Sequence, residues 1–366
     1  MDSPYSPLEF RLLNDYQRDF PLVAEPFRRI ADALGSDEAT VLATLAKLAR
    51  RGAVSRVGAV LAPRRIGAST LAALAAPADR LEEIAALVSA VPEVNHNYQR
   101  EHPINLWFVV TAGGEAELAA ILAGIEARTG CAVISLPLVE EYHIDLGFDL
   151  AGSGRRCILA RAAESAASSN SAAPAASANS GAAPASPNSA ESPTRPKPAA
   201  PPASPDAAGR RLLAALQGGL ELLPRPYARL AAAAGLSEAA TLARLKDLQG
   251  DGTIKRFGVV VRHHELGFNA NAMVVFDVPD DRVAECGRRL ATQPGVTLCY
   301  RRRRAAPQWP YNLYCMVHGR ARGEVEATIA RLQGLAAWPA AALFSTRRFK
   351  QQGARYFAAA PIASHV

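Results

Sequence analysis

Gly52-Ala-Val-Ser-Arg56-Val-Gly58-Ala-Val-Leu61 occurs a second time as Gly252-Thr-Ile-Lys-Arg256-Phe-Gly258-Val-Val-Val261, so that Arg56 and Arg256 are 200 residues apart. Further along, Tyr98 matches Tyr300 in the same way, at a slightly larger separation. A match over so long a period indicates two whole copies of one fold rather than a solenoid of short repeats.

The segment between the two copies, residues 152–208, is dominated by Ala, Ser, Pro, Gly and Asn. Such a composition cannot bury enough apolar surface to offset the entropy lost on ordering the chain. The segment is therefore predicted to be a flexible linker that leaves the two copies free to pair with each other.

Each copy begins with helices and one short strand. Helical spacing and capping residues predict helices within residues 9–50, followed by a strand over Val54–Leu61. The second copy repeats this pattern, with its strand over Ile254–Val261. Helix, helix, turn, helix and strand is the order of a winged helix-turn-helix domain. We therefore expect such domains over residues 1–62 and 209–262.

The rest of each copy, residues 63–151 and 263–358, follows the β-α-β-β-α-β order of a ferredoxin-like domain. The first copy has predicted strands over Ser69–Ala75, Val94–Arg100, Asn105–Thr111 and Ala132–Leu138, and helices over Asp79–Ala90 and Glu115–Thr129. In the second copy the strands are Asn269–Phe276, Val296–Arg302, Asn312–His318 and Ala341–Ser345, and the helices are Asp280–Gln293 and Gly323–Gln333. The predicted fold is thus α+β, a tandem duplication whose sheets each keep one face free of helices.

A row of polar side chains stands out on the second predicted strand of the first copy. Because strand residues alternate between faces, His96, Tyr98, Arg100 and His102 should share one face. Such a row is costly on a half-buried strand unless a charged group lies against it. The alternative is an exposed hairpin with solvated polar residues, but the second copy carries a related row that includes Tyr300.

Composition limits the functions of the chain. With 366 residues, 49% of them hydrophobic, each copy is long enough for its own core. The net charge of +7 suits a nucleic acid or another polyanionic ligand. Five cysteines without C-x-x-C spacing favour reduced thiols over disulfides or zinc, so no protein metal site is predicted. The chain shows no signal peptide and no apolar run of about 20 residues, so we expect a cytoplasmic protein that does not enter a membrane.

A winged helix followed by a ferredoxin-like domain resembles the Lrp/AsnC family of amino-acid-responsive transcription regulators, whose first domain reads DNA. The expected recognition helices, within Glu38–Arg51 and Ser237–Leu248, offer few side chains for contacts with base edges. Transcription regulation is therefore the alternative function, and DNA binding is not expected.

The two hairpins resemble the siroheme decarboxylases, Lrp-like enzymes of the heme d1 and alternative heme pathways. The resemblance is specific in Tyr98 to Phe108 and in Trp309 to Gly319, and it covers both copies but not the linker. In that family the two related subunits are often separate chains, and this sequence looks like a fusion of the denitrification type. The resemblance implies removal of the acetate carboxyls at C12 and C18 of siroheme, giving 12,18-didecarboxysiroheme and carbon dioxide.

The resemblance also implies roles for residues. Loss of carbon dioxide leaves a carbanion equivalent that must be protonated, and a histidine is an acid with a suitable pKa. The candidates for catalysis are His96, His102, Tyr98 and Arg100. The candidates for substrate binding are Trp107, Asn105, Tyr300, Arg302, Arg303, Trp309, Tyr311, Asn312 and Tyr314, with Arg301 and Arg304 as further carboxylate ligands.

Several alternatives stay open at this point. Asn105 and Asn312 could equally satisfy backbone groups of the hairpins, and the run of arginines that begins at Arg301 could be a solvated basic turn. Either His96 or His102 could contact the siroheme iron, which belongs to the substrate, so no separate cofactor is expected. The sequence leaves open which copy holds the site. The expected partners are siroheme and the other copy, with a further dimer as an open alternative.

Overall fold

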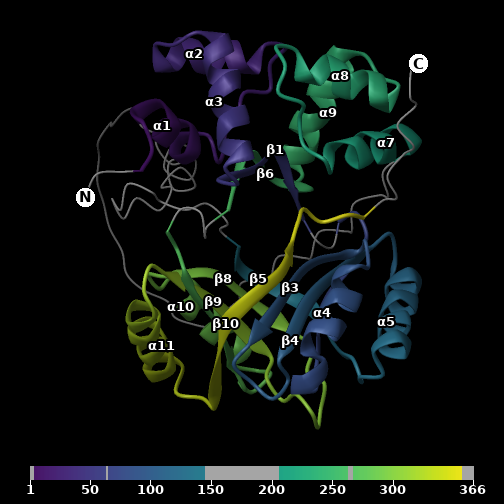
Figure 1. The fold of residues 1–366 in the computed structure, drawn as a ribbon, viewed down its shortest axis with the longest axis vertical. Coiled ribbons are helices and arrows are strands. Elements are labelled where there is room, and N and C mark those ends of the chain that lie inside the picture. The colour runs from purple at the N-terminus through teal and green to yellow at the C-terminus, as the bar shows by residue number, and fades with distance from the viewer. Residues whose placement is uncertain (1–3, 63–64, 145–205, 263–266, 357–366) are drawn as a thin grey trace, which may run out of the picture. The chain divides into compact units, whose positions relative to one another are not determined.

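The structure is a computed structural model that describes residues 4–62, 65–144, 206–262 and 267–356 (Figure 1). Helices open each copy, as predicted. Their bounds are α1 Pro7–Asp15, α2 Pro26–Leu34 and α3 Glu38–Arg50 in the first copy, and α7 Ala207–Leu216, α8 Pro226–Ala234 and α9 Glu238–Gly250 in the second.

Side-chain caps fix where four of these helices start, namely α1, α3, α7 and α9. The carboxylate of Asp37 accepts a hydrogen bond from the backbone N–H of Thr40 at the start of α3. Asp206 caps α7 in the same way, so the predicted end of the linker at residue 208 is wrong. The earlier part of that linker, up to residue 205, lies outside the described residues.

The strand that ends each helix-turn-helix part pairs with its counterpart from the other copy. Strands β1 Val54–Leu61 and β6 Ile254–Val261 form an antiparallel ribbon, here called the wing ribbon, with Gly58 opposite Gly258. Glycine is needed there, because a Cβ on Gly258 would lie 2.4 Å from the Gln17 carbonyl oxygen. Helices of both copies share one hydrophobic core with the ribbon. The two helix-turn-helix parts thus form a single module.

Eight strands of the described residues close into one barrel in the order β10-β3-β4-β2-β5-β8-β9-β7. The first copy supplies β2 Ala68–Leu74, β3 Val94–Arg100, β4 Leu106–Ala112 and β5 Ile134–Ile144. The second supplies β7 Ala270–Phe276, β8 Val296–Arg302, β9 Leu313–Gly319 and β10 Ala340–Gln351. The tandem ferredoxin-like order is therefore confirmed, with the helix-free faces of the two sheets turned toward each other.

The last strand of each copy joins the two sheets. Strand β5 pairs first with β2 and then, from Leu138 to Ile144, with β8 of the other copy. Strand β10 likewise pairs with β7 and then with β3. The predicted strands Ala132–Leu138 and Ala341–Ser345 are therefore too short, because they omit the segments that cross to the other copy.

Helices cover the outside of the barrel, and each copy has a separate core beneath them. The barrel interior holds another apolar cluster, in which Trp107 and Trp309 have ring centroids 4.8 Å apart. Among the described residues, no helix is both long enough and apolar enough to span a membrane. The outer elements are η1 Ala78–Arg80, α4 Leu81–Ser89 and α5 Glu115–Thr129 in the first copy, and α10 Val283–Ala291 and α11 Arg322–Ala336 in the second (Figure 1).

Candidate active site

A cavity of about 390 Å³ is lined by the wing ribbon, by barrel strands of both copies and by the segment that follows β10. Apolar side chains form part of its wall, among them Leu71, Val109, Met273, Leu298 and Met316. Its cationic and imidazole groups are Arg56, His96, Arg100, Lys255, Arg256, Arg262, Arg302 and His318. No aspartate or glutamate is among the described residues that line it. The cavity therefore matches a ligand that is apolar in its body and anionic at its edges.

Alternation along β3 directs its polar row into this cavity. His96, Tyr98 and Arg100 line the cavity, whereas Asn97 turns the other way and donates a hydrogen bond from Nδ2 to the Ala85 carbonyl at 3.1 Å. The strand ends at Arg100, so His102 belongs to the following loop and is not a lining residue. The predicted row is thus one residue shorter than the sequence pattern suggests.

Two arginines occupy equivalent positions of the two copies. Arg100 donates from Nη1 to the Leu343 carbonyl at 2.9 Å, and Arg302 donates from Nη1 to the Leu136 carbonyl at 2.8 Å. The Nε atom of each is buried and has no hydrogen-bond partner among the described residues. Burial is also the main reason why the pKa of Arg100 is lowered to about 10. Charged donors without partners are costly in a protein interior, and a carboxylate would satisfy them.

His96 is the histidine of β3 that lines the cavity, and its ring lies 6.3 Å from that of Tyr98. Burial, and then the charge of Arg56, lower the pKa of His96 to about 4. The imidazole is therefore neutral at pH 7, and its pKa is lower than the near-neutral value expected of the catalytic acid. A carboxylate placed beside it would raise its pKa toward neutrality.

The predicted aromatic residues divide into two groups. Trp107 and Tyr300 line the cavity, and the Arg302 guanidinium lies 4.6 Å from the centre of the Tyr300 ring. Three other aromatic residues predicted to touch the ligand do not line the cavity, namely Trp309, Tyr311 and Tyr314. They pack within the barrel cluster instead, where the Trp309 indole N–H donates to the Tyr314 hydroxyl at 2.7 Å.

His102, Asn105 and Asn312 serve the hairpins rather than the cavity. The His102 Nδ1 accepts a hydrogen bond from the Ile104 backbone N–H at 3.0 Å, and its ring packs edge-on against Trp309. Asn105 both donates to and accepts from the backbone of Ala76, with each bond 2.9 Å long. Asn312 makes the same pair of bonds with Val278. For both asparagines the backbone alternative is therefore correct.

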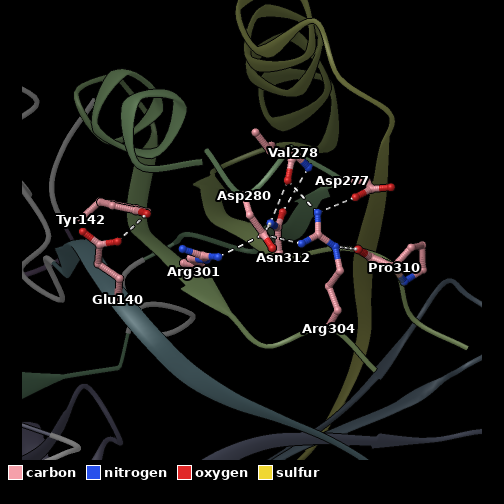
Figure 2. Close-up of polar contacts among 9 residues, drawn as sticks. All are labelled: Glu140, Tyr142, Asp277, Val278, Asp280, Arg301, Arg304, Pro310 and Asn312. Atoms are coloured by element: carbon pink, nitrogen blue, oxygen red, sulfur yellow. Dashed lines mark hydrogen bonds and ion pairs between the residues drawn. The ribbon is translucent and has the colours of Figure 1, made fainter. Parts of the chain in front are cut away.

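The basic run beginning at Arg301 also separates into different environments, and Figure 2 shows those of Arg301 and Arg304. Arg301 and Arg304 both contact the Asp280 carboxylate, at 3.0 and 2.6 Å, and Arg304 contacts Asp277 at 2.8 Å as well. The bond from Arg304 is the main reason why the pKa of Asp280 is lowered. Arg303 is exposed. Of this run, only Arg302 lines the cavity, so the positions of its neighbours give no support to the prediction that they bind substrate carboxylates.

Comparison with known proteins identifies the family of the chain. The AsnC-like ligand binding domain model matches residues 65–143 and 265–350, and the siroheme decarboxylase NirDL-like HTH domain model matches residues 9–54 and 209–254. The siroheme decarboxylase NirDL subunit of Paracoccus denitrificans is 43% identical over 350 residues, covering 95% of this chain and 96% of that protein. The chain belongs to the siroheme decarboxylase family.

Two further members of the siroheme decarboxylase family illustrate its organisation. The siroheme decarboxylase NirD subunit of Pseudomonas aeruginosa is 55% identical over 146 residues, which cover 40% of this chain and 97% of that protein. A crystal structure of the siroheme decarboxylase NirDL in co-complex with an iron-uroporphyrin III analogue matches with a TM-score of 0.62 and 27% identity. That match covers 96% of this chain and 94% of the other, so it extends over both copies.

Sequence reasoning missed the arginines of the wing ribbon. Arg56 and Arg256 both reach the cavity from this ribbon. His318 also lines the cavity, from β9, and its Nδ1 lies 2.8 Å from the Thr297 hydroxyl. A signal for the arginines was present, because both lie in the stretch that defines the duplication. The face they occupy depends on how the two copies pair, which neither copy specifies alone.

Proposed function

We propose that siroheme binds in this cavity and loses there the carboxyl groups of its acetates at C12 and C18. The products are 12,18-didecarboxysiroheme, an intermediate of heme d1 biosynthesis, and carbon dioxide. As a member of the siroheme decarboxylase family, the chain is a carboxy-lyase. The observation that supports this location is a partly apolar cavity whose arginines have buried, unused donor atoms and whose described lining residues include no acidic group.

The shape and charge of the cavity suit a tetrapyrrole that carries many carboxylates. The macrocycle would pack on apolar groups such as Val109 and Met316 and on the Trp107 ring. Its carboxylates would accept hydrogen bonds from Arg100 and Arg302, which enter from opposite copies. A site lined by both copies requires their pairing, and the shared strands β5 and β10 provide it.

Decarboxylation breaks the bond between the acetate methylene carbon and its carboxylate. The electron pair stays on the methylene carbon, from which it delocalises into the macrocycle, and a proton then completes a methyl group. Because the substrate itself accepts the electrons, the proposed chemistry needs no separate cofactor. We propose that His96 delivers the proton after a substrate carboxylate has raised its pKa.

The other candidate acid has a different environment. The His102 Nδ1 accepts a backbone hydrogen bond, and its ring packs against Trp309 outside the cavity lining. We therefore assign His102 neither proton transfer nor iron ligation. Tyr98, which shares the cavity face with His96, is the proposed hydrogen-bond partner of the reacting acetate.

The transcription-regulator alternative receives little support from the helix-turn-helix module. Lys47 of α3 and Arg51, which directly follows α3, contact the Glu9 carboxylate at 3.0 and 3.5 Å. Both side chains are thus partly occupied within the module rather than free for phosphate or base contacts. On the wing ribbon, Arg56 and Arg256 line the cavity.

The test is incubation of the purified protein with siroheme in the absence of oxygen, followed by mass spectrometry of the tetrapyrrole. A product lacking two carbon dioxide units is expected. Unchanged siroheme, together with tight and salt-sensitive binding to promoter DNA, would instead favour the regulator.

A further inference from the structure

The wing ribbon holds two arginines at equivalent places of the duplication. Arg56 lies opposite Val260 and Arg256 lies opposite Val60, so the two arginines flank the central Gly58–Gly258 pair symmetrically. Both line the cavity, although they belong to the helix-turn-helix module rather than to the barrel. The module therefore contributes cations to a site whose predicted residues all lie in the ferredoxin-like domains.

Neither arginine has its donors fully used by the protein. Arg56 donates from Nη2 to the Ala59 carbonyl at 3.0 Å, but its Nε is buried without a partner among the described residues. The Nη1 of Arg256 is likewise buried without a hydrogen-bond partner among the described residues. Burial lowers the pKa of both groups, and for Arg256, where the value falls to about 10, the charges of Arg18 and Arg56 lower it further. The two cations thus repel each other, and no acidic lining residue offsets them.

The neighbouring Lys255 of the ribbon differs from this pair, because it forms an ion pair with Glu141. Gly353 packs closely against the guanidinium of Arg56, since a Cβ on Gly353 would lie 2.8 Å from the Arg56 Nη1. Unused donors, mutual repulsion and a close glycine all indicate that Arg56 and Arg256 are arranged for an anion that enters the cavity.

We propose that Arg56 and Arg256 each bind a carboxylate of the macrocycle from the ribbon side, so that the helix-turn-helix module sets the carboxylate specificity of the site. This inference rests on the proposed function, in which Arg100 and Arg302 bind carboxylates from the barrel side. A macrocycle with carboxylates all around its edge satisfies both sets of arginines. A macrocycle with fewer carboxylates leaves buried guanidinium donors unpaired and is selected against.

The test measures equilibrium binding of two iron porphyrins that cannot report on turnover of siroheme. Iron-uroporphyrin is an octacarboxylate, and iron-coproporphyrin is a tetracarboxylate that lacks the acetate carboxyls. Dissociation constants would be measured by absorbance titration for the unmodified protein, Arg56→Gln, Arg256→Gln and the conservative variants Arg56→Lys and Arg256→Lys. Arg229→Gln is the matched control, because Arg229 pairs with Glu221 and does not line the cavity.

Each glutamine variant should weaken iron-uroporphyrin binding by about 10- to 100-fold, as expected for a lost charged hydrogen bond. Iron-coproporphyrin binding should weaken less, so the preference of the protein for the octacarboxylate should shrink. The lysine variants should recover part of this preference. The thermal midpoint of Arg56→Gln should change little, since the lost hydrogen bond to the Ala59 carbonyl is offset by removal of a desolvated charge that has no ion pair among the described residues. The proposal would be overturned if the glutamine and lysine variants bound both porphyrins more weakly by the same factor. It would also be overturned if these variants bound both porphyrins as tightly as the unmodified protein does. Because only binding is measured, this result is separate from whether siroheme is decarboxylated.

Discussion

Binding of a polycarboxylate macrocycle should make His96 take up a proton. Burial and the charge of Arg56 lower the pKa of His96 to about 4. A ligand carboxylate beside the ring would offset the charge of Arg56 and stabilise the imidazolium, so the pKa rises on binding. Between the two pKa values the complex then holds more protons than the free protein. Affinity should consequently increase as the pH falls through this range.

The size of the effect follows from the two pKa values. If the ligand only restores the ordinary histidine pKa of about 6.5, the protonated fraction of His96 at pH 6 rises from about 1% to about 75%. This corresponds to an uptake of roughly 0.7 proton for each ligand bound. Near pH 6, lowering the pH by one unit should then strengthen binding roughly fivefold.

Isothermal titration calorimetry of iron-uroporphyrin binding can measure this uptake, when repeated at pH 6 in buffers of different ionisation enthalpy. His96→Asn should lose the uptake. His102→Asn is the matched control and should keep it, because His102 is not among the cavity-lining residues. The reasoning is refuted if the unmodified protein takes up no proton, or if His96→Asn takes up as many protons as the unmodified protein does.

Further predictions concern catalysis, stability and assembly. His96→Ala should lower kcat for siroheme by roughly 10²- to 10⁴-fold with binding largely retained. His102→Ala should leave kcat nearly unchanged, and steady-state kinetics of both variants would measure the difference. Arg304→Met should reduce the free energy of unfolding by roughly 1–2 kcal/mol through loss of its bonds to the β7–α10 loop, without changing porphyrin affinity, as chemical denaturation and titration would show. Separately expressed residues 1–150 and 204–366 should decarboxylate siroheme only when mixed, because β5 and β10 each complete the sheet of the other copy. Activity of either fragment alone would contradict that expectation.

Much of the fold could be predicted because helices and strands depend on local periodicity. The predicted strand Val94–Arg100 and helix Glu115–Thr129 match β3 and α5 residue for residue. The crossing segment Leu138–Ile144 could not be predicted, since its pairing partner β8 lies in the other copy. Its residues Glu140, Glu141 and His143 show no apolar alternation that would mark a strand.

The candidate site was predictable to the extent that it depends on strand alternation. Alternation was enough to put His96, Tyr98 and Arg100 on one face. It could not show that Trp309 packs on Trp107 within the barrel, because that contact joins two copies. It could not show either that the wing ribbon lines the cavity, since this depends on the module as a whole.

The central claim is that one cavity, lined by both copies, is the place where siroheme reacts. Anaerobic titration of the protein with siroheme, followed by mass spectrometry of the tetrapyrrole at each addition, tests it most directly. One siroheme should bind per chain. Up to that equivalence point, every bound tetrapyrrole should lose the two acetate carboxyl groups at C12 and C18. Binding of two sirohemes per chain, one to each copy, would contradict the claim, as would full turnover by a variant in which His96, Arg100 and Arg302 are all replaced.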